Sequence, residues 1–270
     1  MSQRITSLLA LTFAALGAGC ASRPVASAAA PGTLVAIFAH PDDESIVSPA
    51  LARYARDGTK VYVIVATDGR KGVSRHAGIP AGDSLAAVRA REARCSAAAL
   101  GAQPPILFAF EDAGLAVGSP WPGEPMDRLA QRIDSTLRVL RPDAVITWGP
   151  EGGYGHADHR LVGDVVTQLF QSGAISETLP LYYVGFTADR LVGAPRWFGM
   201  RIYPTSPALL SARITYEEQD RAASRRALGC HRSQATEQQM DESFATLEQL
   251  WHGQVSFQQW RGGPVRSRLF

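Results

Sequence analysis

The sequence predicts an α/β protein with a mostly parallel sheet and helices on both of its faces. Three observations lead to this class. From Thr33 onward, short apolar runs alternate with longer helical segments, which is the pattern of a parallel α/β sheet. The length of 270 residues suits one large domain or two small ones, and such a chain can bury a core without a disulfide or a metal. The hydrophobic fraction of 46% and the charged fraction of 19% exclude a disordered chain.

Each expected strand is a short apolar run, and each expected helix is a longer segment of mixed composition. Strands are expected at residues 34–39, 61–66, 106–110, 143–148 and 181–186. Helices are expected at residues 45–57, 83–100, 126–140, 216–228 and 235–251. Gly58 and Gly101 support two of the helix ends, because glycine commonly follows the last helical residue. No internal repeat is visible, so we expect one domain over residues 33–253 and a C-terminal tail over residues 254–270.

The first twenty residues are typical of an export signal. Arg4 is the only charge before Arg23, and the apolar run between them is diluted by glycine, serine and threonine. A membrane-spanning helix needs about 20 strongly apolar residues, so residues 1–20 fit an export signal better. The run Leu-Gly-Ala-Gly-Cys that ends at Cys20 resembles a bacterial lipobox, whose cysteine is lipidated and becomes the new N-terminus. Cleavage beside another small residue is the alternative.

Residues 21–32 are rich in Ala, Ser and Pro, which predicts a flexible tether. The protein is therefore expected to be exported, as a periplasmic or membrane-tethered lipoprotein or, alternatively, as a secreted protein. Membrane contact would be limited to the N-terminal lipid anchor or signal. In such a compartment Cys95 and Cys230 could form a disulfide, and two free buried cysteines are the alternative.

Charge and cysteine usage exclude two further classes of protein. The chain has 27 basic and 25 acidic residues, so its net charge of +2 creates no strong field for a nucleic-acid partner. It has three cysteines and no Cys-x-x-Cys pair, which excludes a disulfide-rich scaffold and gives no sign of a structural zinc site made of cysteines.

A histidine and three acids follow the first expected strand. They are His40, Asp42, Asp43 and Glu44. Acids in the first turn of a helix complement its dipole, at about 0.3–1 kcal/mol each, and this accounts for one or two of them. It does not account for a histidine beside two adjacent carboxylates at the carboxyl end of a strand, where open α/β sheets bind ligands. Because Asp42 and Asp43 are neighbours, one can bind a metal while the other faces the water on that metal.

The second cluster spans residues 152–159, just after the fourth expected strand. It contains glycines that let the backbone turn tightly, together with His156 and His159. These histidines share a face if a helix begins here, because they are three residues apart. The first and fourth strands could deliver both clusters to one crevice. A single histidine is more often structural, but three histidines with acids on two strand ends favour a metal centre.

The run His-Pro-Asp-Asp-Glu at residues 40–44 and the run His-x-Asp-His at residues 156–159 together resemble the PIG-L (LmbE-like) deacetylase family. The similarity covers roughly residues 33–234. It includes Arg89-x-x-Glu in an Ala-rich helix and Asp112-Ala-Gly-Leu after the third strand. The resemblance implies a Rossmann-like fold and zinc-dependent removal of acetyl from N-acetylglucosamine units on glycolipids, mycothiol and bacillithiol precursors and related glycosides.

The resemblance also implies roles for individual residues. His40, Asp43 and His159 would hold the zinc, a set that leaves one coordination position for water. Asp42 would be the general base toward this water, whose pKa zinc lowers from 15.7 to about 7. Either Asp42 or His156 would then protonate the leaving amine.

Four more residues take roles from the same resemblance. Tyr154 and His156 would help to stabilise the oxyanion. Asp158 would orient His156 by accepting its other ring proton. Arg89 and Asp112 match family positions that contact sugar hydroxyls.

One loop departs from the family pattern. Related enzymes often carry Thr-x-Gly-Glu-x-Gly after the second strand, whereas this chain reads Thr-Asp-Gly-Arg-Lys-Gly at residues 67–72. Arg70 therefore stands where the glutamate is expected. One interpretation is a solvated loop charge, since loops lie at the surface. The other is a substrate-binding residue that changes the preference, for example toward an anionic group.

The sequence thus predicts an exported zinc-dependent N-deacetylase whose partner is an N-acetylated sugar or glycoconjugate. One alternative is a metal-dependent hydrolase of another amide or ester. Another is a carbohydrate-binding lipoprotein without catalysis. The latter would be expected to lose Asp42 or a metal ligand, and this chain has lost neither.

Overall fold

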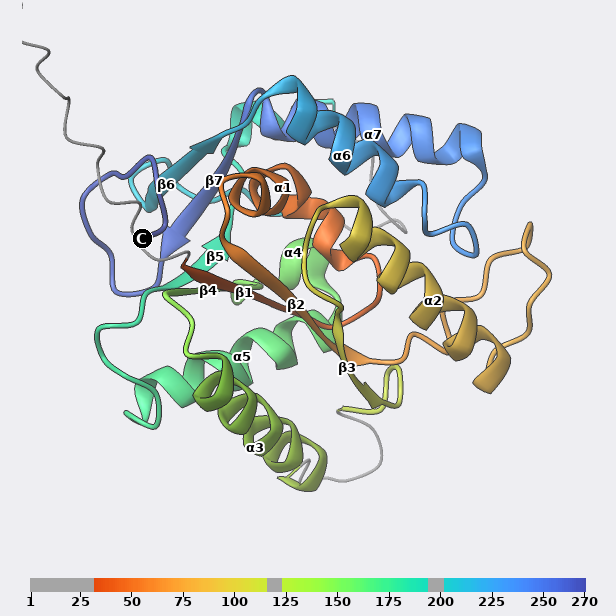
Figure 1. Cartoon of the computed structure of the whole chain (residues 1–270), viewed down its shortest axis with the longest axis horizontal. Coiled ribbons are helices and arrows are strands. Elements are labelled where there is room, and N and C mark those ends of the chain that lie inside the picture. The colour runs from red at the N-terminus through yellow and green to blue at the C-terminus, as the bar shows by residue number, and fades with distance from the viewer. Residues whose placement is uncertain (1–31, 116–122, 194–201) are drawn as a thin grey trace, which may run out of the picture. The chain divides into compact units, whose positions relative to one another are not determined.

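The computed structural model describes residues 32–115, 123–193 and 202–270 (Figure 1). These residues form a seven-stranded sheet in the order β3-β2-β1-β4-β5-β7-β6. The strands are β1 (Thr33–Phe38), β2 (Lys60–Thr67), β3 (Ile106–Phe110), β4 (Ala144–Thr147), β5 (Leu181–Val184), β6 (Leu210–Thr215) and β7 (Gln254–Gln259). Strands β1 to β5 pair in parallel, and β7 runs antiparallel to both β5 and β6. The α/β class with a mostly parallel sheet is confirmed.

The helices lie on both faces of the sheet, as predicted. They are α1 (Ser48–Arg56), α2 (Asp83–Ala99), α3 (Gly123–Leu140), α4 (Gly152–Gly155), α5 (Ala157–Gln171), α6 (Glu218–Leu228) and α7 (Glu237–Trp251), with short 3-10 turns at Asp43–Val47 and Ala188–Leu191. Helices α1, α6 and α7 pack on one face and α3 and α5 on the other (Figure 1). In β1, Leu34, Ala36 and Phe38 join the first core. Val35 and Ile37 join the second, so β1 is buried on both faces.

Residues 254–270, expected as a tail, belong to the domain. Strand β7 lies between β5 and β6, with Val255 and Phe257 fully buried. Leu269 is also fully buried, and its carbonyl oxygen accepts a hydrogen bond of 2.8 Å from the hydroxyl of Tyr182. The expected boundary at residue 253 is therefore wrong. Strands β6 and β7 escaped the sequence analysis because their short period-two patterns contain many polar residues.

Most of the remaining boundaries agree with expectation to within a few residues. Strand β3 has the bounds that the sequence predicts. The helix expected at residues 45–57 begins instead as the 3-10 turn from Asp43 and continues as α1, which has Pro49 in its first turn. Helix α5 begins directly after His156, so the condition for His156 and His159 to lie near each other is met.

Cys95 and Cys230 form a disulfide, which decides between the two alternatives left open by the sequence. It joins α2 to the segment that follows α6, across 135 residues of sequence. No helix among the described residues is long and apolar enough to cross a membrane. The export signal, the Cys20 lipidation site and the tether up to residue 31 lie outside the described residues.

The topology explains how two distant motifs meet. Strand β1 pairs with β2 on one side and β4 on the other, all in parallel. The carboxyl ends of β1 and β4 are therefore neighbours at one edge of the sheet. His40 follows β1, and residues 152–159 follow β4, so both clusters open into the crevice where open α/β sheets bind ligands.

Candidate metal centre

The chain turns sharply between β1 and α1. Asp42 has a φ of 121°, a region in which residues other than glycine are uncommon. The turn places Asp43 over the end of β1, where its Oδ2 accepts hydrogen bonds from the backbone N–H of Ala39 at 3.0 Å and of His40 at 2.9 Å. An unfavourable backbone conformation that the surroundings hold in place at a strand end indicates a functional constraint.

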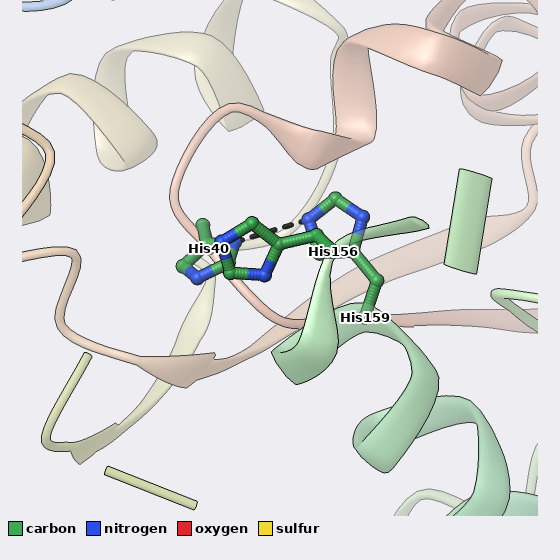
Figure 2. Close-up of side chains that lie close together, drawn as sticks. All are labelled: His40, His156 and His159. Atoms are coloured by element: carbon green, nitrogen blue, oxygen red, sulfur yellow. Dashed lines mark hydrogen bonds between the residues drawn. The ribbon is translucent and has the colours of Figure 1, made fainter. Parts of the chain in front are cut away.

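Three buried side chains from the two strand ends converge on one point. His40 Nδ1 lies 3.1 Å from His159 Nε2, which lies 3.1 Å from Asp43 Oδ1. His40 Nδ1 and Asp43 Oδ2 are 3.8 Å apart. Figure 2 shows the rings of His40 and His159 facing each other, with His156 beside them. The structure brings the two clusters together as the sequence predicts.

The outer nitrogens of the two rings fix where their protons lie. His40 Nε2 is 3.2 Å from Asp112 Oδ1 and 3.3 Å from Asp158 Oδ2, so it donates to carboxylates. His159 Nδ1 is 3.1 Å from the carbonyl oxygen of Gly152 and donates to it. In each neutral ring the inner nitrogen then carries a lone pair. Two lone pairs and a carboxylate oxygen facing one another are satisfied by a divalent cation, and outer hydrogen bonds of this kind orient metal-binding histidines.

The charges around His40 also favour a cation. Burial lowers the pKa of His40, but its hydrogen bonds to Asp112 and Asp158 outweigh burial and raise the pKa to about 10. Without a cation the His40 ring would therefore carry a second proton, on Nδ1, and a divalent cation bound between the two rings would displace that proton. Burial raises the pKa of Asp43, yet His159 and His40 hold it well below its usual range. The acids therefore remain ionised around the two rings.

Among the described residues, two groups of three side chains could each hold a metal ion, because within each group the possible ligand atoms lie within 4.8 Å of one another. They are His40 with His156 and His159, and His40 with Asp112 and Asp158. In the second group His40 Nε2 donates to both carboxylates, which suits hydrogen bonds rather than a metal. His156 in the first group is an alternative to Asp43 as the third ligand. His159 Nε2 lies 3.1 Å from Asp43 Oδ1, so Asp43 reaches the same point as the two rings, as the set that the family resemblance implies requires.

Trp148 completes the wall of the centre and was missed by the sequence analysis. Its ring stacks on His159 at 4.4 Å between centroids and 4° between planes. Its Nε1–H donates to Asp43 Oδ2 at 3.3 Å. The residue thus fixes the orientation of two of the three metal-binding candidates. Its place at the end of the fourth apolar run was the only signal in the sequence.

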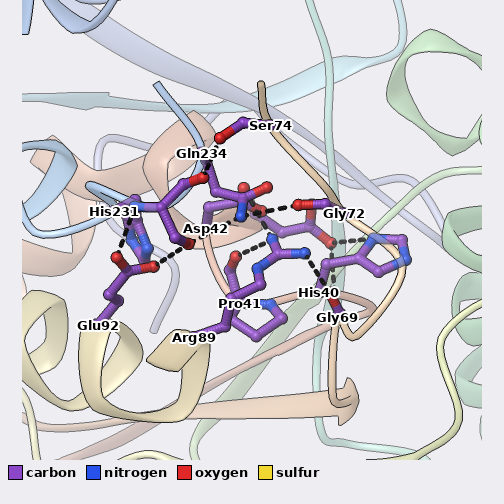
Figure 3. Close-up of polar contacts among 12 residues, drawn as sticks. His40, Pro41, Asp42, Gly69, Gly72, Ser74, Arg89, Glu92, His231 and Gln234 are labelled. Atoms are coloured by element: carbon purple, nitrogen blue, oxygen red, sulfur yellow. Dashed lines mark hydrogen bonds and ion pairs between the residues drawn. The ribbon is translucent and has the colours of Figure 1, made fainter. Parts of the chain in front are cut away.

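Asp42 is held by Arg89 rather than by the metal ligands. The guanidinium of Arg89 donates to Asp42 Oδ2 at 2.9 Å and to the carbonyl oxygens of Pro41 at 2.5 Å and Gly69 at 3.0 Å (Figure 3). Arg89 is only 3% exposed, so the residue expected to contact sugar hydroxyls lies beneath the site and positions Asp42. Burial raises the pKa of Asp42 and outweighs the opposing attraction of Arg89.

Asp158 does not accept a proton from His156, which corrects one expectation. Its carboxylate instead accepts from His40 and from the backbone N–H of Ala113 at 2.9 Å. His156 caps α5, and its Nδ1 accepts a hydrogen bond of 3.2 Å from the backbone N–H of Asp158. Because the N-cap position uses the Nδ1 lone pair, the ring proton of neutral His156 lies on Nε2.

At neutral pH the imidazole of His156 and the hydroxyl of Tyr154 are both uncharged, and each still carries one proton that it can donate. Burial, together with the charges of His40 and His159, lowers the pKa of His156, so its ring is neutral. Burial raises the pKa of Tyr154 far above its usual value. The edge of the Tyr154 ring contacts His159 at 5.1 Å between centroids. Both residues therefore offer hydrogen-bond donors next to the ligand set.

Asp112 lies at the Nε2 side of the His40 ring, whose Nδ1 faces His159, and Arg70 lies next to Asp112 through Asp68. Asp112 Oδ2 accepts from the backbone N–H of Lys71 at 2.9 Å, and its other oxygen faces His40. Arg70 donates to Asp68 Oδ2 at 2.7 Å and lies 3.1 Å from Asp83. About a third of the Arg70 side chain is exposed, so it can still reach solvent. Contact of either residue with a sugar stays a prediction.

Glu44 belongs to a second buried cluster, although it adjoins Asp43. Its Oε1 accepts from His231 Nε2 at 2.8 Å and from Ser96, and its Oε2 accepts from the backbone N–H of Asp42 at 3.1 Å. We call Glu44, Ser96 and His231 the structural cluster. His231 is therefore a polar contact of the core and lies outside the metal centre.

A comparison with protein families decides where this chain belongs. The model of the family "PIG-L: GlcNAc-PI de-N-acetylase" matches residues 35–170, which contain both motifs of the metal centre. The chain belongs to the PIG-L family. The chain spans about half the length of the first curated relatives that it matches. It is 36% identical over 150 residues to a 1D-myo-inositol 2-acetamido-2-deoxy-alpha-D-glucopyranoside deacetylase 2 of Catenulispora acidiphila, with 49% of each chain covered.

Two more relatives carry different functional names. A deacetylase of the same inositol glycoside from Segniliparus rotundus is 28% identical over 241 residues, covering 74% of this chain and 76% of the relative. A mycothiol S-conjugate amidase of Streptomyces coelicolor is 30% identical over 160 residues, covering 54% of each chain. These relatives are named as a deacetylase and as an amidase.

Solved structures confirm the LmbE-like fold of the PIG-L family. The N,N'-diacetylchitobiose deacetylase from Pyrococcus horikoshii superposes with a TM-score of 0.63 at 18% identity, covering 84% of this chain and 83% of that one. A teicoplanin deacetylase gives 0.62 at 17% identity, covering 84% and 97%. A 4-carboxy-2-hydroxymuconate hydratase from Pseudomonas putida gives 0.60 at 14% identity, covering 85% and 96%. At these identities the likeness shows the fold alone, and the reaction must be argued from the site.

Proposed function

We propose that this PIG-L family protein is a zinc-dependent hydrolase that removes an acetyl group from the nitrogen of an N-acetylated sugar or glycoconjugate. The observation that carries the proposal is the meeting of His40 Nδ1, His159 Nε2 and Asp43 beside a second, separately held carboxylate, Asp42. Two histidines and one carboxylate form a ligand set typical of catalytic rather than structural zinc. The relatives named as glycoside deacetylases support the substrate class.

The ligand set would hold zinc through His40, Asp43 and His159. Zinc would supply a Lewis acid that polarises a carbonyl and lowers the pKa of water toward about 7. The protein keeps this set rigid, because the outer nitrogens of both histidines are hydrogen-bonded and Trp148 covers His159.

Asp42 is placed to accept a proton from the attacking water. Arg89 holds Asp42 Oδ2 at 2.9 Å, which leaves the second carboxylate oxygen to receive the proton. Burial keeps its pKa above the usual aspartate value, and a general base works best as its pKa approaches the working pH. The same carboxyl group of Asp42 can then return the proton to the leaving nitrogen. Asp42 would thus transfer protons, whereas Asp43 would bind the metal.

Tyr154 and His156 would stabilise the negative charge that develops on the carbonyl oxygen. His156 is neutral with its proton on Nε2, and the Tyr154 hydroxyl keeps its proton. Donors fixed before the reaction lower the barrier because they need no reorganisation as charge appears. A neutral His156 acts here as a hydrogen-bond donor, which favours Asp42 as the group that protonates the amine.

The test combines metal analysis with amine release from a panel of N-acetylated sugars, esters and peptides. We expect about one zinc per chain and amine release from N-acetylated sugars that stops on chelation and returns with zinc. Cleavage of esters or peptides in preference to the sugars would favour the alternative hydrolase. A metal-loaded protein that binds the sugars without releasing amine would favour the carbohydrate-binding alternative.

We also propose that the chain is exported and that Cys20 carries lipid. The N-terminal composition and the Cys95–Cys230 disulfide support this, because disulfides persist mainly in oxidising compartments. Mass spectrometry of protein from native membranes should find a lipidated Cys20 at the N-terminus. A mature chain that begins after Cys20 would leave export intact and exclude the lipid anchor.

A further inference from the structure

A cavity of about 230 Å³ opens beside the two adjacent aspartates of the metal centre. Its walls come from the 3-10 turn at Asp43–Val47, the segment after β4, the end of α6 with the segment that follows it, and α7. The side chains that give it its character are Ile46, Trp148, Leu228, Met240, Ser243 and Leu247. All but one of these six are apolar. The cavity is therefore a hydrophobic compartment that touches Asp42 and Asp43 at one end.

The polar groups of this wall are largely occupied by the protein itself. His231 donates to Glu44, and the amide of Gln234 donates to Gly72 O at 3.1 Å (Figure 3) and to Ser233 Oγ at 2.8 Å. Ser45 Oγ and His231 Nδ1 have no partner among the described residues, but both atoms are buried beneath the surface. A sugar placed among the apolar side chains of this cavity would leave most of its hydroxyl groups without partners, at a cost for each. An alkyl chain would lose no hydrogen bonds here, because it has no polar groups.

The other side of the metal centre has the opposite character. Asp112 faces His40 there, and Arg70 and Asp68 lie next to it, with part of Arg70 exposed. The exposed part of the Arg70 guanidinium can donate to the hydroxyl groups of a sugar, while the side chains of Asp112 and Asp68 are largely buried and hold Arg70 and the loop in place. The site thus has a polar side and an apolar side, with the metal-binding residues between them.

The chemistry of an amide assigns a substituent to each side. A secondary amide is planar and almost always trans, so its nitrogen substituent and its acyl carbon chain leave in opposite directions. If the sugar on the nitrogen lies toward Asp112, the acyl chain lies toward the cavity. An acetyl group would place only one methyl at the mouth of a cavity of about 230 Å³.

We propose that this cavity is an acyl-chain subsite and that the protein hydrolyses N-acyl sugars with an acyl group longer than acetyl faster than it hydrolyses N-acetyl sugars. The proposal rests on the proposed function and extends it to the acyl group. Water adds its hydroxyl group to the acyl carbon and a proton to the nitrogen as the C–N bond breaks. The products are a short-chain carboxylic acid and the free amino sugar.

The first experiment measures amine release by the zinc-loaded full chain from methyl glucosaminides with N-acetyl, N-butanoyl and N-hexanoyl groups. Each methylene buried in an apolar site contributes about 0.8 kcal/mol, or about fourfold. Butanoyl has two more methylenes than acetyl, so we expect kcat/KM to rise from acetyl to butanoyl by about fifteenfold. A steady fall with chain length, with acetyl hydrolysed well, would overturn the acyl subsite and leave the proposed function standing. Absence of amine release from every member would overturn both.

The second experiment fills the cavity. Ser243 lines it from α7 and is only partly buried, so Ser243→Phe places a ring in the cavity without disturbing the core. The matched control is Ala245→Phe, on the exposed side of the same helix. We expect Ser243→Phe to lower the ratio of hexanoyl to acetyl kcat/KM at least tenfold, and Ala245→Phe to leave the ratio unchanged.

A third arm tests whether the cavity takes the aglycone instead. The substrates are N-acetylglucosaminides with methyl and octyl aglycones, so the acyl group stays constant. We expect Ser243→Phe to have the same effect on both. A selective loss with the octyl glycoside, and none along the acyl series, would assign the cavity to the aglycone and overturn the proposal.

Discussion

Asp43 and Glu44 are adjacent in sequence, and each faces a buried histidine. The metal centre around Asp43 and the structural cluster around Glu44 nevertheless differ in how donors and acceptors are paired. In the structural cluster, every oxygen of Glu44 accepts from a donor, among them His231 and Ser96. In the metal centre, Asp43 Oδ2 accepts from three N–H donors, whereas His40 Nδ1, His159 Nε2 and Asp43 Oδ1 face one another while the outer ring nitrogens donate elsewhere. The same residue types thus build a buried ion pair in one place and a candidate cation site in the other. The count of donors and acceptors, rather than residue type, separates structure from chemistry.

The largest effects should follow from removing one metal ligand. We expect His159→Ala to lose zinc and to reduce amine release to the uncatalysed rate, with the same result for His40→Ala and Asp43→Ala. Stability should fall as well, because a metal that binds only the folded state adds its binding free energy to folding. Zinc content, activity and thermal unfolding, each with and without a chelator, check this expectation.

The matched variant for this comparison is His231→Ala in the structural cluster. It should keep about one zinc per folded chain, because His231 contacts Glu44 and no metal-ligand candidate. Stoichiometric zinc in His159→Ala would show that His156 replaces it or that the ligand set is wrong.

Asp42→Asn should give the next largest effect and separates catalysis from metal binding. The amide has nearly the shape of the carboxylate and can still meet Arg89, so zinc and KM should change little. Loss of a general base lowers kcat by about 10²–10⁴-fold, a barrier increase of roughly 3–5 kcal/mol. The rate of the wild type should rise with pH as Asp42 ionises, above the usual aspartate pKa because burial raises it.

Two outcomes would contradict this role for Asp42. Loss of zinc from Asp42→Asn would make Asp42 a ligand and exchange its role with that of Asp43. Full turnover in Asp42→Asn would show that the reaction does not need Asp42 as a general base. The disappearance of the acid limb of the pH profile in the variant is the outcome that supports it.

The sequence predicted the parts of the fold and the site that depend on local pattern. Buried parallel strands such as β1 are continuous apolar runs, and the motifs at their carboxyl ends had to meet because β1 and β4 are neighbours. Strands β6 and β7 could not be predicted, since their polar residues hide a period of two and only pairing with β5 stabilises them.

The partners of individual side chains were harder to predict than the positions of motifs. Arg89 was expected at the sugar, but it is buried against Asp42. Asp158 was expected to face His156, but the N-cap geometry turns His156 Nδ1 to the backbone and frees the carboxylate for His40. Such contacts depend on the register between a loop and a helix, which residue spacing does not fix.

A smaller effect on stability is expected from the disulfide beside the structural cluster. Cys95 on α2 and Cys230 before His231 close a long loop of the chain, which restricts the unfolded state. The double change Cys95→Ser and Cys230→Ser should lower the free energy of unfolding by about 2–4 kcal/mol. Urea unfolding checks this, with reduced wild type as the control. Zinc content should stay unchanged, because neither cysteine contacts the metal centre.

The smallest effect concerns the charge on His231, and it varies with pH. Burial lowers the pKa of His231, but the charge of Glu44 outweighs burial and raises it, while His231 lowers the pKa of Glu44. A raised histidine pKa stabilises the fold below its ordinary value of 6.5, and this is lost as pH rises through the folded pKa. A lowered glutamate pKa stabilises the fold above its ordinary value of 4.5, and this is lost as pH falls.

The ion pair should therefore stabilise the protein most between about pH 4.5 and 6.5. His231→Gln keeps a hydrogen-bond donor for Glu44 but removes the charge, so it should cost about 1–3 kcal/mol at pH 5.5 and less at high pH. Urea unfolding at both pH values measures the difference, and His252→Asn, an exposed histidine at the end of α7, is the control. An equal loss at both pH values would mean that the pair is neutral. A pH-dependent loss with zinc retained would show that the structural cluster binds a proton where the metal centre binds a cation.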